Sequence, residues 1–211
     1  GNSIPIVDVS DNMSQYNDDY YYAAIGYAIL LAQKSLFTNR ILLVDQIPTW
    51  IELDTTHCFV SIVQHIQLSI QSSFTIANFN SAFHLIGKTI RNSELSGQDI
   101  RNLRLVLFST TSNLTSSLLH YDNILSIFNL YCFHVPFIVY WNVSNEVGEL
   151  FPCSIHQHST IMISGTSTNL LHVLLNKFKH KHTTPYKTIC NLLRSPHYNI
   201  LENYIHHIIS R

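Results

Sequence analysis

Charged side chains are scarce in this chain. Asp, Glu, Lys and Arg make up 12% of its 211 residues, where globular proteins usually carry about a quarter. The formal net charge is -1 and no segment concentrates basic residues, so direct contact with the phosphates of a nucleic acid is disfavoured. A surface with so little charge favours a protein partner that covers part of it, and association of the chain with itself is an alternative.

Long apolar runs and paired cysteines are also absent. The run Ala23–Ala32 is too short to cross a bilayer, and no charged-then-apolar leader opens the chain. The four cysteines are scattered without a Cys-x-x-Cys pair, which is typical of reduced thiols inside a cell. We therefore expect a cytoplasmic or otherwise intracellular protein without membrane contact. The start at Gly1, just before an apolar segment, favours a fragment of a larger protein.

Motifs for catalysis are missing as well. The chain has no Gly-x-Ser-x-Gly turn and no His-Glu-x-x-His helix motif, so we do not expect an enzyme. The pairs His156/His158 and His180/His182 have no cysteine at ligand spacing within them, and we interpret them as exposed loop residues. Cys153, three residues before His156, leaves zinc as an alternative. We expect no cofactor.

What the chain does contain is an alternation of apolar segments with the periods of strands and helices. The predicted strands are Ile4–Val9, Arg40–Asp45, Thr49–Leu53, Leu103–Phe108, Val135–Trp141 and Ser159–Ser164. The predicted helices are Asp18–Leu36, Phe59–Ile70, Phe79–Ile90, Ser116–Tyr131, Thr168–Phe178, Pro185–Leu193 and Ile200–Ile209.

This order of elements predicts an α/β fold. We expect a doubly wound, mostly parallel, Rossmann-like sheet of about six strands with helices on both faces. The turn at Pro48 is too short for a helical crossover, so Thr49–Leu53 should be an antiparallel edge strand. We expect one domain over residues 1–211, with a helical C-terminal extension over about 184–211.

The segment Asp8-Val9-Ser10-Asp11-Asn12 directly follows the apolar run Ile4–Val7. An Asp-x-Ser after a buried strand resembles the first metal-binding loop of a von Willebrand factor A (vWA) domain. Further segments are similar to landmarks of one vWA-like family. That family is the C-terminal domain of large intracellular proteins of plants and giant DNA viruses. The similar segments are Phe79–Ile86, Val135–Asn142, Ile161–Gly165 with Leu170-Leu171, and Thr184–Lys187. The resemblance extends from Pro5 to about Tyr198. It implies a vWA sheet with a cation site at its carboxyl edge and implies no particular reaction.

The chain departs from the family's metal site at three places. Asn12 replaces the second Ser of the first loop, Ala77 stands where the second loop carries Thr, and Thr110 stands where the third carries Asp. Because Mg²⁺ prefers six hard oxygens with carboxylates among them, Asp8 would be left as the chief anion. We therefore expect a degenerate metal-ion-dependent adhesion site. Mg²⁺ held by Asp8, Ser10 and Asn12 is the alternative.

The resemblance and the composition together predict a non-enzymatic protein-interaction module. Its binding face is expected at the carboxyl edge of the sheet and should contain Asp8, Ser10, Asn12, Ala77, Asn78 and Thr110. Two alternatives remain open. One is a structural or assembly protein, such as a viral particle component, that uses the fold as a scaffold. The other is an accessory domain associated with RNA.

Overall fold

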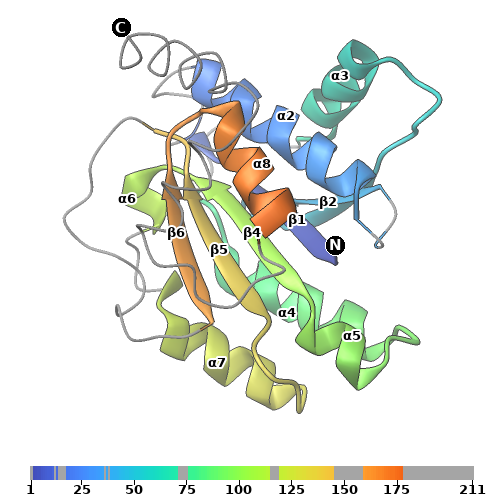
Figure 1. Cartoon of the computed structure of the whole chain (residues 1–211), viewed down its shortest axis with the longest axis vertical. Helices are drawn as coiled ribbons and strands as arrows, with labels where there is room; N and C mark the ends of the chain where they lie inside the picture. The colour runs from blue at the N-terminus through green and yellow to red at the C-terminus, as the bar shows by residue number, and fades with distance from the viewer. Residues whose placement is uncertain are drawn as a thin grey trace, which may run out of the picture. The chain divides into compact units, whose positions relative to one another are not determined.

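Six strands form one mixed sheet in the computed structural model of the chain (Figure 1). The structure describes residues 2–11, 13, 18–35, 37, 39–70, 76–114, 119–144 and 159–177. The strands are β1 (Ser3–Asp8), β2 (Arg40–Val44), β3 (Thr49–Glu52), β4 (Arg104–Ser109), β5 (Phe137–Asn142) and β6 (Thr160–Ser164). Their positions confirm the predicted strands to within a few residues at each end.

The strand order is β3-β2-β1-β4-β5-β6. All neighbouring pairs are parallel except β2 and β3, which run antiparallel with Ile41 opposite Ile51. The predicted doubly wound α/β fold and its antiparallel edge strand are therefore confirmed. Because the strands other than β3 are parallel, their carboxyl ends lie along the same edge of the sheet.

The sheet reverses its winding between β1 and β4. The chain leaves β1 toward β2 and β3, and then returns to the other side of β1 to form β4, β5 and β6. In open α/β sheets of this kind the crevice at the carboxyl ends of the two central strands is the usual place for a ligand. The ends of β1 and β4 are therefore the first place to look for a site.

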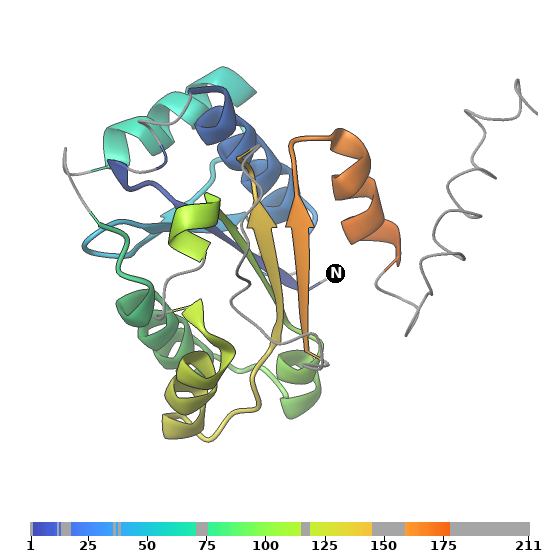
Figure 2. The same ribbon diagram turned by 90° about the vertical axis from the view of Figure 1, so that its left-hand side faces the viewer.

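Helices cover both faces of the sheet, as predicted. In chain order, the helices of the described residues are α2 (Asp18–Gln33), α3 (Phe59–Ser69), α4 (Phe79–Arg91), α5 (Gly97–Arg101), α6 (Thr111–Leu114), α7 (Tyr121–Leu130) and α8 (Thr168–Lys177). Helix α2 contacts β1, β2 and β4, whereas α4 contacts β2 and α7. Figure 2 shows α2 and α3 on one side of the strands, with α4 and α7 on the other.

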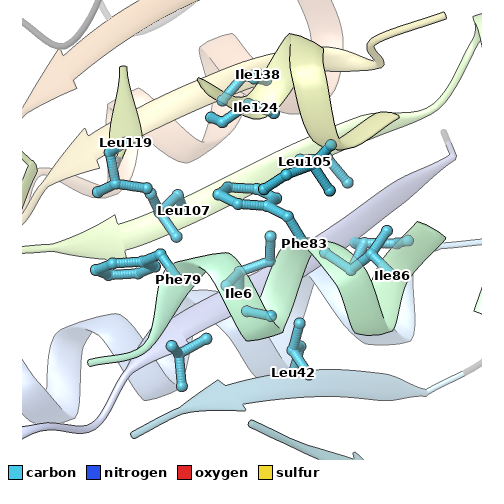
Figure 3. Close-up of a cluster of buried hydrophobic side chains, with 14 of the residues drawn as sticks. Ile6, Leu42, Phe79, Phe83, Ile86, Leu105, Leu107, Leu119, Ile124 and Ile138 are labelled. Carbon is cyan, nitrogen blue, oxygen red and sulfur yellow. The ribbon is translucent and has the colours of Figure 1, made fainter. Parts of the chain in front are cut away.

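The core has one layer on each side of the sheet because successive strand residues point to opposite faces. Leu107 belongs to a buried cluster with Phe79 and Phe83 of α4 (Figure 3). Its neighbour Phe108 faces the other way, toward α2. There the ring of Tyr27 stacks on Trp141 with 5.0 Å between ring centroids and lies 6.3 Å from the ring of Phe108.

Gly165 directly follows the last residue of β6. Its φ of 102° is a conformation that residues with a side chain rarely adopt. Its carbonyl accepts a hydrogen bond of 2.8 Å from Nε1 of Trp141. The turn after β6 is thereby fixed to the neighbouring strand β5.

The helices differ from the prediction at three places. Helix α5 was not predicted, although Ser96 and Asp99 form a capping box at its start. Helix α6 was not predicted either, and it has only four residues. The helix expected from Ser116 begins at Tyr121, because His120 before it is in an extended conformation with ψ of 136°; residues 115–118 lie outside the described part.

The chain divides into two compact units, residues 1–170 and 171–211. The first contains the whole sheet. The single domain expected over residues 1–211 stays a prediction, since 178–211 lie outside the described residues, together with the helices expected at Pro185–Leu193 and Ile200–Ile209. Among the helices that are described, none is both long and apolar enough to cross a membrane.

Candidate functional site

Asp8 is the last residue of β1 and lies at the point where the sheet reverses its winding. Its side chain is 0% exposed. The next residue keeps the loop against the sheet, since the backbone nitrogen of Val9 donates to the carbonyl of Val44 at 3.0 Å. A carboxyl group is therefore fully buried at the edge where the sequence predicts a cation site.

One oxygen of the Asp8 carboxyl is held by the residue two positions later. Oδ1 accepts hydrogen bonds from the backbone nitrogen of Ser10 at 3.0 Å and from its hydroxyl at 2.6 Å. This is an Asx turn closed a second time by the serine side chain. The Asp-x-Ser motif therefore forms a local structure that satisfies Oδ1 within the loop itself.

The other oxygen is held by the last residue of β4 and by a residue that follows this strand. Oδ2 accepts from the hydroxyl of Ser109 and, at 2.6 Å, from the amide nitrogen of Asn113 in α6. That amide nitrogen also lies 3.4 Å from Oγ of Ser10. The loops after β1 and β4 thus converge on one carboxyl group, and both of its oxygens are bonded to the chain.

Burial dominates the acid chemistry of Asp8. Desolvation raises the pKa of this carboxyl above its usual value, although hydrogen bonds from Ser10, Ser109 and Asn113 act in the opposite direction. The four hydrogen bonds come from neutral donors. Neutral donors only partly compensate for the loss of water around a charge.

A second polar turn of the same form lies at the end of β5. Oδ1 of Asn142 accepts from the backbone nitrogen of Ser144 at 3.0 Å and from its hydroxyl at 2.7 Å. The amide nitrogen of Asn142 donates to Oγ1 of Thr111 at 2.7 Å. Asn142-x-Ser144 therefore repeats the geometry of Asp8-x-Ser10 with an uncharged residue in the first position, and α6 joins the two turns.

The structure places the other predicted site residues along this same edge. Ala77 is buried in the core cluster, and Thr110 is buried directly after Ser109. Asn78 is the N-cap of α4: its side chain accepts a hydrogen bond from the backbone nitrogen of Ser81 at 3.1 Å. Its backbone nitrogen donates to the carbonyl of Asp45, just after β2, at 2.8 Å. Asn12 lies outside the described residues.

The described residues do not fit a magnesium ion. Mg²⁺ requires near-octahedral oxygen ligands at about 2.1 Å, and here the amide nitrogen of Asn113 takes up the side of Asp8 that faces Ser10. Within the described part of the chain, no three His, Cys, Asp or Glu side chains gather closely enough to hold a metal ion. The arrangement is a closed hydrogen-bond network.

Two strongly exposed isoleucines lie at this edge. Ile47, in the turn after β2, is 69% exposed, and Ile76, two residues before Asn78, is 81% exposed. The backbone nitrogen of Ile47 donates to Oδ1 of Asp45 at 2.8 Å, so the turn that carries it is fixed. The contact between Asn78 and Asp45 brings the two segments together. We call Ile47 and Ile76 the isoleucine pair.

Sequence reasoning missed five members of the network: Ser109, Thr111, Asn113, Asn142 and Ser144. Asn142 had a readable signal, since Asn-x-Ser after an apolar strand repeats the Asp8-x-Ser10 pattern. Asn113 had none, because it reaches Asp8 only through the pairing of β1 with β4. A cavity of about 360 Å³ was also not predicted; it lies near the opposite edge, lined by Ile4, Arg40 and Trp50 among others.

A protein family and solved structures are similar to this chain over most of its length. The family described as "Domain of unknown function (DUF7788)" matches residues 2–191, and no curated protein sequence matches. Among solved structures, proximal thread matrix protein 1 (PTMP1) from the mussel byssus is similar with 11% identity and a TM-score of 0.46, over 82% of this chain and 46% of that one. The SpRpn10 VWA domain is similar with 15% identity and a TM-score of 0.41, over 83% of this chain and 93% of that one. The chain spans less than half the length of the mussel protein.

Proposed function

Because the chain belongs to the DUF7788 family, we propose its function from its own geometry: a non-enzymatic protein-interaction module of vWA type with a degenerate cation site. Two features support the vWA type. The sheet order places β1 beside β4, and an Asp-x-Ser turn ends β1 at that position. The internal bonding of Asp8 supports binding that does not depend on a metal.

The observation that carries the proposal is the isoleucine pair. Burying an exposed isoleucine against a partner contributes roughly 1.5–3 kcal/mol. Two exposed isoleucines lie near Asn78, whose own side chain is bonded to its helix. We propose that a protein partner covers this pair with an apolar surface of its own. Half-buried Asn78 and exposed Gln46 would form part of the polar rim of that contact.

Photo-crosslinking tests this proposal. p-Benzoyl-phenylalanine is placed at position 47, at position 76 and, as the matched control, at position 130. Leu130 is also strongly exposed, at 70%. It is the last residue of α7 and precedes β5, so it lies toward the amino edge of the sheet, opposite the carboxyl edge that carries the isoleucine pair. A partner of this edge is captured from positions 47 and 76 and is not captured from position 130.

The captured protein is then purified and its affinity measured with and without EDTA. Ile47→Asp and Ile76→Asp should each weaken binding by about tenfold or more, since each buries a charge in an apolar contact. Leu130→Asp and EDTA should leave the affinity unchanged. Capture of the same proteins from all three positions, or loss of binding in EDTA, would contradict the proposal.

A second candidate function, a structural or assembly protein, is supported by helix α3. Phe59, Val60 and Leu68 of this helix are all exposed. The helix is held to α2 through the side-chain amide of Gln67, which donates to the hydroxyl of Tyr22 at 2.9 Å. An apolar helix surface on a chain with little net charge favours contacts between copies of the chain.

A further inference from the structure

The amide group of Asn113 lies between the two oxygen atoms that would hold a cation at this edge. Its nitrogen is 2.6 Å from Oδ2 of Asp8 and 3.4 Å from Oγ of Ser10. A magnesium ion bound to the same two oxygens would be about 2.1 Å from each. The nitrogen and such an ion cannot both be present on that side of the carboxyl group.

The chemistry of the amide fixes which of its ends faces Asp8. A carboxylate only accepts hydrogen bonds, so an amide oxygen at this distance would be repelled. The NH₂ group has two hydrogens, and these match the two oxygens of Asp8 and Ser10. Helix α6 holds the group in place, since the backbone nitrogen of Leu114 donates to the carbonyl of Thr110 at 3.0 Å.

We infer that Asn113 takes the place of the cation and that its uncharged amide makes this edge of the sheet independent of metal. The turn at β5 supports this inference. There the amide nitrogen of Asn142 donates to the hydroxyl of Thr111 in α6. The same network therefore contains two such contacts, in which the NH₂ group of an asparagine donates to a side-chain oxygen at the end of a neighbouring strand or in α6. The inference concerns the contacts at Asp8 and does not depend on the protein partner proposed above.

The substitution Asn113→Asp tests it. A second carboxylate would face Asp8 at the distance of the present hydrogen bond, and two buried carboxylates repel each other unless a proton or a cation lies between them. Thermal unfolding of the EDTA-treated chain is followed with no metal and with 10 mM Mn²⁺. We expect Mn²⁺ to raise the Tm of Asn113→Asp by about 4 °C or more, because an ion that binds only the folded state stabilises it. The wild-type Tm should change by less than about 1 °C.

Asn123→Asp is the matched control. Asn123 also donates its amide nitrogen to a side-chain oxygen, Oδ1 of Asn80, at 2.7 Å, but that oxygen belongs to an uncharged amide. In this variant the new carboxylate faces the amide of Asn80 in place of a carboxylate, so Mn²⁺ should not raise its Tm. An equal shift in Asn123→Asp and Asn113→Asp would overturn the inference, since any new carboxylate would then suffice.

Asn113→Ala decides the question if the aspartate variant does not fold. It removes the amide from the side of Asp8 that faces Ser10, while the hydrogen bonds from Ser10 and Ser109 to the carboxyl remain; an ion could then take the place of the amide. Electron paramagnetic resonance should show bound Mn²⁺ in Asn113→Ala and none in the wild-type chain at the same concentration. Equal Mn²⁺ binding by the two proteins, or none by either, would overturn the inference.

Discussion

At the scale of single residues, two aspartates in the same kind of turn have opposite acid chemistry. Asp8 is buried, and desolvation raises its pKa. Asp54 accepts from the backbone nitrogen of Thr56 at 2.8 Å and from its hydroxyl at 2.6 Å, and these hydrogen bonds lower its pKa because the group is exposed. The turn is the same in both, and burial decides the direction of the shift.

This difference predicts how stability depends on pH. A raised folded-state pKa means that the Asp8 contribution to stability is complete below the unfolded value of 3.8 and is lost as pH rises through the folded value. Asp8→Asn removes that loss, so its free energy of unfolding should improve relative to wild type as pH rises from about 4 to 8. Urea unfolding at several pH values measures the difference.

Asp54→Asn is the control for this prediction. Its lowered pKa places the change in stability below pH 3.8, where the Asp54 contribution is lost as pH falls through the folded value. His57 lies 3.2 Å from the Asp54 carboxylate and can change charge in this range, so the control is made in a His57→Ala background. There the difference caused by Asp54→Asn should stay flat between about pH 4 and 8. A flat difference for Asp8→Asn as well would contradict the dominance of burial at Asp8.

The candidate site could be predicted from the sequence only where it is local. Asp8 and Ser10 are two residues apart, and a single motif contains both. Ser109 and Asn113 are 101 and 105 residues away from Asp8, and the sheet order alone brings them to it. The residue that replaces the cation is therefore visible only after the fold is known.

At the scale of helices, two glycines in helix interiors have different surroundings. A methyl group at Gly87 of α4 would lie 2.5 Å from a ring carbon of Tyr131, at the end of α7. A methyl group at Gly26 of α2 would meet only Cζ of Phe59, at 3.8 Å. Gly87 is therefore required by the close contact of two helices, and Gly26 is not.

We predict opposite effects of alanine at these positions. Gly26→Ala should raise the free energy of unfolding by about 0.5–1 kcal/mol, because alanine loses less backbone entropy in a helix. Gly87→Ala should lower it by about 1–2 kcal/mol, because overpacking against Tyr131 outweighs that gain. Chemical denaturation of both variants provides the measurement, and stabilisation by Gly87→Ala would show that α4 and α7 separate easily.

Sequence patterns predicted long elements well and short ones poorly. Strands such as β4 and β5 are apolar runs buried on both faces, and helix α4 has an apolar stripe, so their periods are readable. Helices α5 and α6 have too few residues to show a period. They form because of their ends: a capping box at Ser96 and Asp99 starts α5, and the Thr110 carbonyl accepts from Leu114 in α6.

At the scale of the whole molecule, the low charge would make any self-association sensitive to pH. The formal net charge is -1 with 13 histidines taken as neutral, and the isoelectric point is about 7.0. Histidines take up protons below about pH 6.5. Each adds one charge, so protonation of all 13 brings the net charge from -1 to +12. Copies of the chain that meet at neutral pH should repel one another at pH 5.5.

If the assembly function holds, the chain should associate at pH 7 and be monomeric at pH 5.5, which light scattering after size exclusion measures directly. If α3 carries the contact, Leu68→Lys should give a monomer at pH 7 too, since Leu68 is exposed on that helix. Leu130→Lys adds the same charge at the end of α7 and should not. A wild-type monomer at high concentration and pH 7 would count against the assembly function.

The stack of Tyr27 on Trp141 gives the protein an optical reporter of its own. Trp141 is fully buried and its indole nitrogen is bonded to Gly165, so its fluorescence is emitted from an apolar surrounding next to a tyrosine that transfers energy to it. The other tryptophan, Trp50, is partly buried in the edge strand β3, with its indole nitrogen donating to Thr89 at 3.2 Å. A water-soluble quencher should reach Trp50 before Trp141. Quenching of Trp50 would then report local unfolding of the edge strand β3, and quenching of Trp141 would report unfolding of the core, without an attached dye.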